Sequence, residues 1–119
     1  MVWRYHPDTR EFEIFAEGGG NVFGLEFDTS GRLFSGHNGG GTRGFHYVQN
    51  GFYLKQGKSP GKFGPPDNPF SFGELPMMPG GNIPRFSHNV IAINGSAMPD
   101  DWQGKLLGAD PLHRHLVLS

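Results

Sequence analysis

The chain has 119 residues, no cysteine and a formal net charge of −1. Disulfides, thiolate chemistry and cysteine-ligated zinc are therefore excluded, and the lack of a basic stripe argues against nucleic acid as a partner. No apolar run is long enough to span a membrane, whereas twenty glycines, ten prolines and eleven phenylalanines favour short strands joined by tight turns and structured loops.

Residues 2–16 have the pattern of a β-hairpin. Trp3 and Tyr5 alternate with polar residues, and Phe12 and Ile14 do the same further along. Because successive side chains of a strand point to opposite faces, the alternation predicts two strands, with the turn at residues 7–9. Since the chain already reads as a strand from its second residue, no signal peptide is expected in this segment.

Two further hairpins are predicted in residues 22–56. The first joins residues 23–27 to residues 32–35 through a turn that ends at Gly31. The second joins residues 45–48 to residues 52–55. Its Asn50-Gly51 pair is typical of a type I′ turn, which requires positive φ at both central positions.

Residues 57–87 form a long proline-rich segment without periodicity, and loops of more than about 15 residues in a compact unit are usually functional or disordered. Strands are expected to resume at 90–93, 105–109 and 114–118. No segment shows a helical period, so essentially no helix is expected.

These elements predict an all-β fold, a partial β-propeller of about two blades made of antiparallel hairpins with long loops. With the strands of a blade lettered A to D from the inside outward, residues 2–16 supply C and D of one blade. Residues 22–56 supply a complete blade, 57–87 an inserted loop, and 88–119 strands A to C of the next. A propeller hides its strand edges by closing its ring, which this segment cannot do alone, so it is expected to be a fragment that needs further blades.

In this register the D-to-A and B-to-C connections leave the blades on one face. Polar, glycine-rich loops on a rigid scaffold are where binding and catalysis are expected. The connections on this face are Gly19–Asn21, His37–Arg43, Arg85–His88 and Asp110–His113.

The loop of residues 36–44 is the densest in polar groups and glycines. His37, Asn38 and Arg43 offer hydrogen-bond donors and an acceptor, and the glycines allow close approach of a ligand, so these three are candidate cofactor-binding residues. A plain turn between two strands would have the same composition.

Arg85 and His88 lie at the entry to an innermost strand. His88 is a candidate general base, and Arg85 is a candidate for holding an anionic cofactor or a developing oxyanion. A hydrogen-bonded loop histidine without chemistry is the alternative. His113 and His115 could face one side of a strand, but two histidines are weak evidence for a metal, and the metal ligands stay unassigned.

Together these segments resemble the membrane-bound dehydrogenase family, large bacterial proteins whose propeller is similar to that of the glucose/sorbosone dehydrogenases. The resemblance covers nearly the whole chain, and it is the combined string of segments, more than any single one, that is specific. Its segments are Trp3–Tyr5, Phe12–Asp28, Gly36–Gly40, Thr42–Tyr47, Asn68–Phe70, Arg85–His88 and Gly104–His113.

The resemblance implies a six-bladed propeller, a periplasmic or extracellular location, and often a separate downstream haem c domain. It also implies pyrroloquinoline quinone and calcium as cofactors, with His88 as the base and Arg85 or Arg43 near the quinone. The expected function is that of a quinoprotein-type dehydrogenase acting on a sugar or alcohol hydroxyl. The competing expectation is a non-catalytic propeller that binds carbohydrate or a partner protein through the same face.

Overall fold

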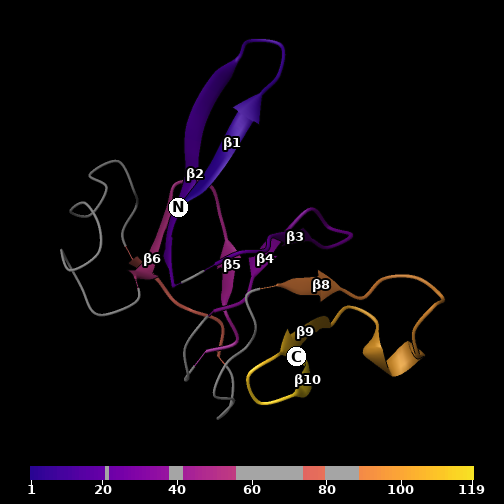
Figure 1. The fold of residues 1–119 in the computed structure, drawn as a ribbon. Coiled ribbons are helices and arrows are strands. Elements are labelled where there is room, and N and C mark those ends of the chain that lie inside the picture. Colours follow the sequence, from indigo (N-terminus) through magenta and orange to yellow (C-terminus); the bar gives the residue numbers. More distant parts are fainter. Residues whose placement is uncertain (21, 38–41, 56–73, 80–88) are drawn as a thin grey trace.

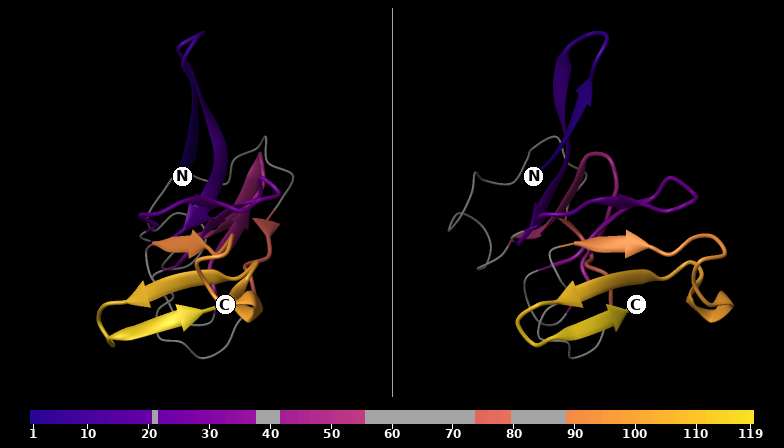
Figure 2. Two further views of the ribbon diagram at one scale, coloured as in Figure 1. Left: turned by 90° about the vertical axis from the view of Figure 1, so that its right-hand side faces the viewer. Right: turned by 45° about the vertical axis from the view of Figure 1, so that its right-hand side comes forward.

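The computed structural model describes residues 1–20, 22–37, 42–55, 74–79 and 89–119, and Figures 1 and 2 show their arrangement. These residues form ten strands in three small sheets. Their only helical part is the 3₁₀ turn η1 (Asp100–Trp102), which confirms the predicted all-β class. No helix among them is long and apolar enough to cross a membrane.

The first sheet has the order β1-β2-β6-β7. Its antiparallel hairpin joins β1 (Val2–His6) to β2 (Glu11–Gly19), which confirms the predicted pair of strands. Strand β6 (Gly51–Lys55) then pairs in parallel with β2, and β7 (Glu74–Leu75) pairs in parallel with β6. In all three views the β1–β2 hairpin extends away from the rest of the chain (Figures 1 and 2).

The middle sheet is antiparallel, with the order β3-β4-β5. It comprises β3 (Glu26–Phe27), β4 (Leu33–Ser35) and β5 (Phe45–Tyr47). The predicted turn between the first two strands forms around the Asp28 carboxylate, which accepts hydrogen bonds from two backbone N–H groups of the turn. Gly31 in this turn has the positive φ, 75°, that the prediction required.

The predicted hairpin between residues 45–48 and 52–55 is wrong. A turn does form, and the Gly51 N–H donates to the Val48 carbonyl at 2.9 Å. However, Asn50 has a φ of 60° whereas Gly51 is not among the glycines with positive φ, so this is not a type I′ turn on Asn50-Gly51. Strand β6 leaves β5 and pairs with β2, and residues 22–56 therefore do not make one four-stranded blade.

Two sets of hydrogen bonds, one from the turn to β2 and one from the Tyr53 side chain, explain why β6 pairs with β2 and not with β5. The Asn50 N–H donates to the Phe15 carbonyl at 2.7 Å, which ties the turn to β2. The Tyr53 hydroxyl accepts a hydrogen bond from the Val48 N–H at 3.0 Å and donates to the His46 carbonyl. A phenol thus satisfies backbone groups that a neighbouring strand would satisfy in a hairpin.

The third sheet is antiparallel, with the order β10-β9-β8, and it confirms the three strands predicted near the C-terminus. Its strands are β8 (Val90–Ala92), β9 (Leu106–Asp110) and β10 (His115–Leu118). Gly24, just before β3, lies so close to Asn89, just before β8, that a Cβ on the glycine would be 2.4 Å from the amide oxygen. The strands β3 and β8, each expected to be the innermost strand of its blade, therefore begin next to each other.

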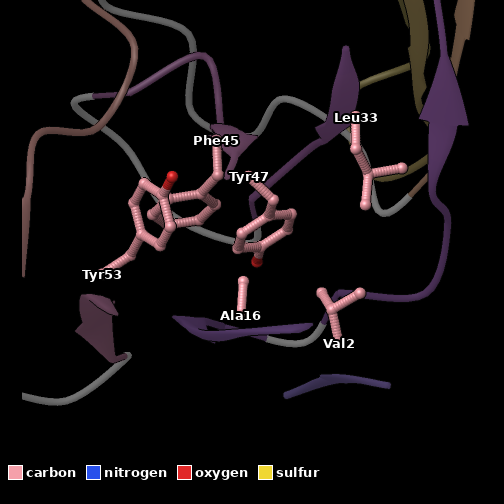
Figure 3. Close-up of a cluster of buried hydrophobic side chains, with 6 residues drawn as sticks. All are labelled: Val2, Ala16, Leu33, Phe45, Tyr47 and Tyr53. Carbon is pink, nitrogen blue, oxygen red and sulfur yellow. The ribbon is translucent and has the colours of Figure 1, made fainter. Parts of the chain in front are cut away.

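Two hydrophobic clusters join the three sheets. The first lies between the first and middle sheets, and Figure 3 shows its aromatic rings gathered over Ala16. The second lies between the middle and third sheets. Adjacent residues of β4 serve both, because Leu33 belongs to the first cluster and Phe34 packs against the second. Small sheets stacked in this way are consistent with a partial propeller. The buried members are Val2, Ala16, Leu33, Phe45, Tyr47 and Tyr53 in the first cluster, and Val90, Leu106 and Val117 in the second.

Candidate functional site

Two of the segments expected on the ligand face meet at His37. The backbone N–H of Gly20, after β2, donates to Nδ1 of His37, after β4, at 3.2 Å. The imidazole also packs edge-on against the Phe45 ring, with ring centroids 5.3 Å apart. Burial lowers the pKa of His37, which favours the neutral ring. Because Nδ1 accepts a hydrogen bond, the proton of that neutral ring lies on Nε2. His37 is therefore a hydrogen-bond donor at Nε2.

The glycines before this contact allow the close approach of β2 to two tyrosines. Gly18 has a φ of 117°, and a Cβ there would lie 2.2 Å from the Tyr53 carbonyl oxygen. A Cβ on Gly19, at a φ of 84°, would lie 2.7 Å from the Tyr47 hydroxyl. That hydroxyl donates to the Gly18 carbonyl at 3.2 Å, and burial, followed by the nearby Tyr53, raises its pKa. Tyr47 thus stays protonated and holds the glycine run in place.

Arg43 is held by bonds on both sides of it. The buried Thr42 hydroxyl donates to the Met78 carbonyl at 2.8 Å and accepts from the Gly44 N–H at 3.0 Å. The Met78 N–H in turn donates to the Gly44 carbonyl at 3.0 Å. These contacts tie the backbone of Met78 to the residues on both sides of Arg43, and its side chain packs against the second hydrophobic cluster.

The guanidinium of Arg43 has an unused donor. Within the ranges that the structure describes, its Nη1 is the one buried side-chain nitrogen or oxygen without a hydrogen-bond partner. Leaving a buried donor unpaired is unfavourable by about 1–3 kcal/mol, more for a charged group. The position therefore fits an anionic or carbonyl oxygen of a bound ligand.

His37 and Arg43 flank a close contact between the two arms of the β4–β5 connection. A Cβ on Gly44 would lie 2.9 Å from the Cα of Gly36, so the arms touch at their base. The other predicted site residues, Asn38, Arg85 and His88, lie outside the described residues, and their convergence with His37 stays a prediction.

A second histidine site lies at the end of β9, in a connection that was expected on the ligand face without a catalytic or cofactor-binding role. One carboxylate oxygen of the buried Asp110 accepts the backbone N–H groups of Leu112 and His113, both at 3.1 Å. The other lies 2.8 Å from Nδ1 of His113, whose side chain is 43% exposed. The available clue was an aspartate two and three residues before the N–H groups it binds, which is the pattern of an Asx turn.

The Asp110 contact fixes the proton of His113. Burial alone would raise the pKa of Asp110, but hydrogen bonds from the His113 ring, from two backbone N–H groups and the charge of His113 together lower it. The ionised carboxylate only accepts hydrogen bonds, so in the neutral form of the His113 ring the proton lies on Nδ1 and the lone pair on Nε2. His113 can therefore take up a proton at Nε2, whereas His37 donates there.

No group of three or more His, Asp or Glu side chains in the described ranges could hold a metal ion, so the metal ligands remain unassigned. Comparison with protein-family models, with curated proteins and with solved structures gives no match for this chain.

Proposed function

We propose that the chain is part of a quinoprotein-type dehydrogenase propeller that oxidises the hydroxyl of a sugar or alcohol. The observation that supports this most directly is the buried Nη1 of Arg43, a cationic donor without an acceptor, on a connection that also carries the donor His37. Further blades would complete the site, and export to the periplasm and a separate haem c domain would accompany such a protein.

The donors fit the chemistry of pyrroloquinoline quinone. This cofactor carries carboxylates and adjacent carbonyl oxygens, which accept hydrogen bonds, so Arg43 and Nε2 of His37 would hold it. Bound quinone would supply the acceptor for the substrate hydride. Calcium, the other cofactor of the proposal, requires oxygen ligands that have no assignment in this chain.

The proton of the substrate hydroxyl requires a separate base. His88 has this role in the proposal because it precedes an innermost strand. His113 is a second candidate, since Asp110 leaves its Nε2 free to accept a proton. His37 is not a candidate, because its Nδ1 is occupied and its Nε2 carries the proton.

A non-catalytic propeller that binds carbohydrate or a partner protein is the second candidate. The observation that favours it is the exposure of Trp3, Tyr5 and Phe12 on the projecting β1–β2 hairpin, each half exposed or more. Aromatic residues are enriched where proteins bind partners, because one ring covers a large area.

The test uses the protein with its complete propeller, loaded with pyrroloquinoline quinone and calcium and assayed on a panel of sugars and alcohols with an artificial electron acceptor. Arg43→Gln should weaken quinone binding by about tenfold or more, the scale of a lost charged hydrogen bond. His88→Ala should lower turnover at least ~100-fold.

Arg32→Gln is the matched control, because that guanidinium pairs with Asp28 in an exposed turn outside the site. Quinone affinity that is equal in the Arg43 and Arg32 variants would contradict the proposed role of Arg43. Carbohydrate binding without quinone and without turnover would favour the second candidate.

A further inference from the structure

Asparagine is followed by glycine at three places in the chain. Because glycine has no side chain, its backbone nitrogen is open to approach the amide carbon of the preceding asparagine. The structure describes two of these pairs, Asn50-Gly51 and Asn94-Gly95, whereas Asn38-Gly39 lies outside the described residues. The two described pairs are chemically identical, so any difference in their reactivity comes from the fold around them.

Asn94-Gly95 lies in the connection between β8 and η1, which is open to solvent. Residues 94–101 are all exposed, and Figure 1 shows this connection at the edge of the molecule. Within the described ranges no protein group accepts the Gly95 N–H, and a Cβ on this glycine would meet no atom within 4 Å. The Asn94 amide is held only by a hydrogen bond from Nδ2 to the Ala92 carbonyl at 3.3 Å. The two reacting groups are therefore free to approach each other.

In Asn50-Gly51 the corresponding nitrogen is held in place. The Gly51 N–H donates to the Val48 carbonyl at 2.9 Å, and the Asn50 N–H donates to the Phe15 carbonyl at 2.7 Å. Gly51 is also buried, and a Cβ there would lie 2.9 Å from the Tyr53 ring. The turn would have to open before the Gly51 nitrogen could reach the side chain of Asn50, since that nitrogen must give up its hydrogen bond.

We propose that Asn94 is a site of spontaneous deamidation and that the fold protects Asn50 from the same reaction. The Gly95 nitrogen bonds to Cγ of Asn94, the Cγ–Nδ2 bond breaks, and Nδ2 leaves as ammonia with the proton of the Gly95 N–H. Water then opens the resulting succinimide at either carbonyl, which gives aspartate or isoaspartate at position 94. Water is the only other reactant, and the reaction is independent of the proposed dehydrogenase function.

The effect of the modification should be confined to this connection. The Ile93 N–H donates to the Lys105 carbonyl at 2.9 Å, and the Gly104 N–H donates to the Ile93 carbonyl at 3.0 Å. These bonds join the two ends of the connection beside the β8–β9 pairing, so the third sheet does not depend on the backbone at position 94. Deamidation therefore adds a negative charge, and in isoaspartate a backbone methylene, to an exposed loop while the sheet stays folded.

Peptide mapping by mass spectrometry tests the proposal, after incubation of the protein in a mildly alkaline buffer that favours loss of the Gly95 proton. Conversion should be about tenfold faster or more at Asn94 than at Asn50, which corresponds to about 1.4 kcal/mol for local opening of the turn before β6. Part of the product should be isoaspartate, because the succinimide can open at either carbonyl. In urea that unfolds the protein, the two sites should react at similar rates.

Tyr53→Phe tests the protection of Asn50. The substitution removes the hydroxyl that binds the Val48 N–H and the His46 carbonyl, so it should speed conversion at Asn50 and leave the rate at Asn94 unchanged. Tyr5→Phe is the matched control, because that ring is half exposed on the β1–β2 hairpin, and it should change neither rate.

Three results would each overturn the proposal. They are equal rates at Asn50 and Asn94 in the folded protein, faster conversion at Asn50, and aspartate at position 94 without isoaspartate. Circular dichroism before and after incubation shows that the strands persist, so that the rates refer to the folded protein.

Discussion

Tyr53→Phe removes a single oxygen atom while keeping a ring of the first hydrophobic cluster. That oxygen accepts the Val48 N–H and donates to the His46 carbonyl, at the end of β5 and in the turn that follows. If residues 45–55 formed a hairpin, the strand at 51–55 would bind these backbone groups and the hydroxyl would be dispensable. In the structure that strand pairs with β2, so the hydroxyl is needed.

The expected effect follows from the two groups left without a partner. An unsatisfied buried backbone group destabilises a protein by about 1–3 kcal/mol. Val48 is only half-buried, so water would satisfy part of the loss, and we expect a total of about 2 kcal/mol. This corresponds to roughly 30-fold in the opening equilibrium, and to a fall in Tm of about 8 °C or more.

Amide hydrogen exchange at Val48, followed by NMR, gives a local readout, and thermal unfolding gives the global one. Exchange at Val48 should be about 30-fold faster in Tyr53→Phe. Tyr5→Phe is the matched control, since that ring is half exposed, and it should change stability by less than ~0.5 kcal/mol. Unchanged exchange at Val48, with stability equal to that of the control, would refute the reasoning and favour the hairpin.

Two other substitutions test the site. Gly44→Ala should destabilise the chain by about 3 kcal/mol or more in thermal unfolding, because φ is 115° and the new Cβ would lie 2.0 Å from the Ser35 carbonyl oxygen. Gly31→Ala is the control: this glycine has positive φ but open space around it, so the loss of stability should be only about 1 kcal/mol. Equal losses in the two variants would contradict the close contact at Gly44. The pKa of Asp110 is below its usual 3.8 in the folded chain, so its stabilisation is complete above that value and is lost as pH falls through the folded pKa. Urea unfolding at a series of acidic pH values should show this loss in the wild type and a flatter profile in Asp110→Asn, whereas identical profiles would argue against the Asp110–His113 contact.

Local patterns in the sequence were sufficient for the elements whose partners are close in the chain. The alternation around Tyr5 and Phe12 predicted both strands of the first hairpin, and the three strands of the third sheet are consecutive in the same way. In such hairpins a turn fixes the pairing, so nearby residues contain the necessary information.

The partner of β6 could not be predicted in this way. The Asn50-Gly51 pair favours a turn, and a turn is present, but it does not decide which strand the chain joins afterwards. That choice depends on Gly18, whose missing side chain lets β2 approach Tyr53, a contact between residues far apart in the sequence. Predicting the partner of β6 would thus have required knowing that the glycine run and Tyr53 lie in contact in the folded chain.

The roles of the histidines could not be predicted from the sequence either, because the role of a histidine depends on which ring nitrogen carries the proton. His37 and His113 are the same residue type in loops expected on one face, and in both rings Nδ1 is the nitrogen with a protein partner. The backbone donor Gly20 leaves a proton on Nε2 of His37, whereas the acceptor Asp110 removes it from Nε2 of His113. The proposed function requires both a donor to the carbonyl or carboxylate oxygens of a quinone and an acceptor for the substrate proton, and these two histidines differ in that respect. Under the proposed function, the partners at Nδ1, one a donor and one a carboxylate, would therefore suit His37 to hold the quinone, and His113 or the resemblance's candidate His88 to accept the proton.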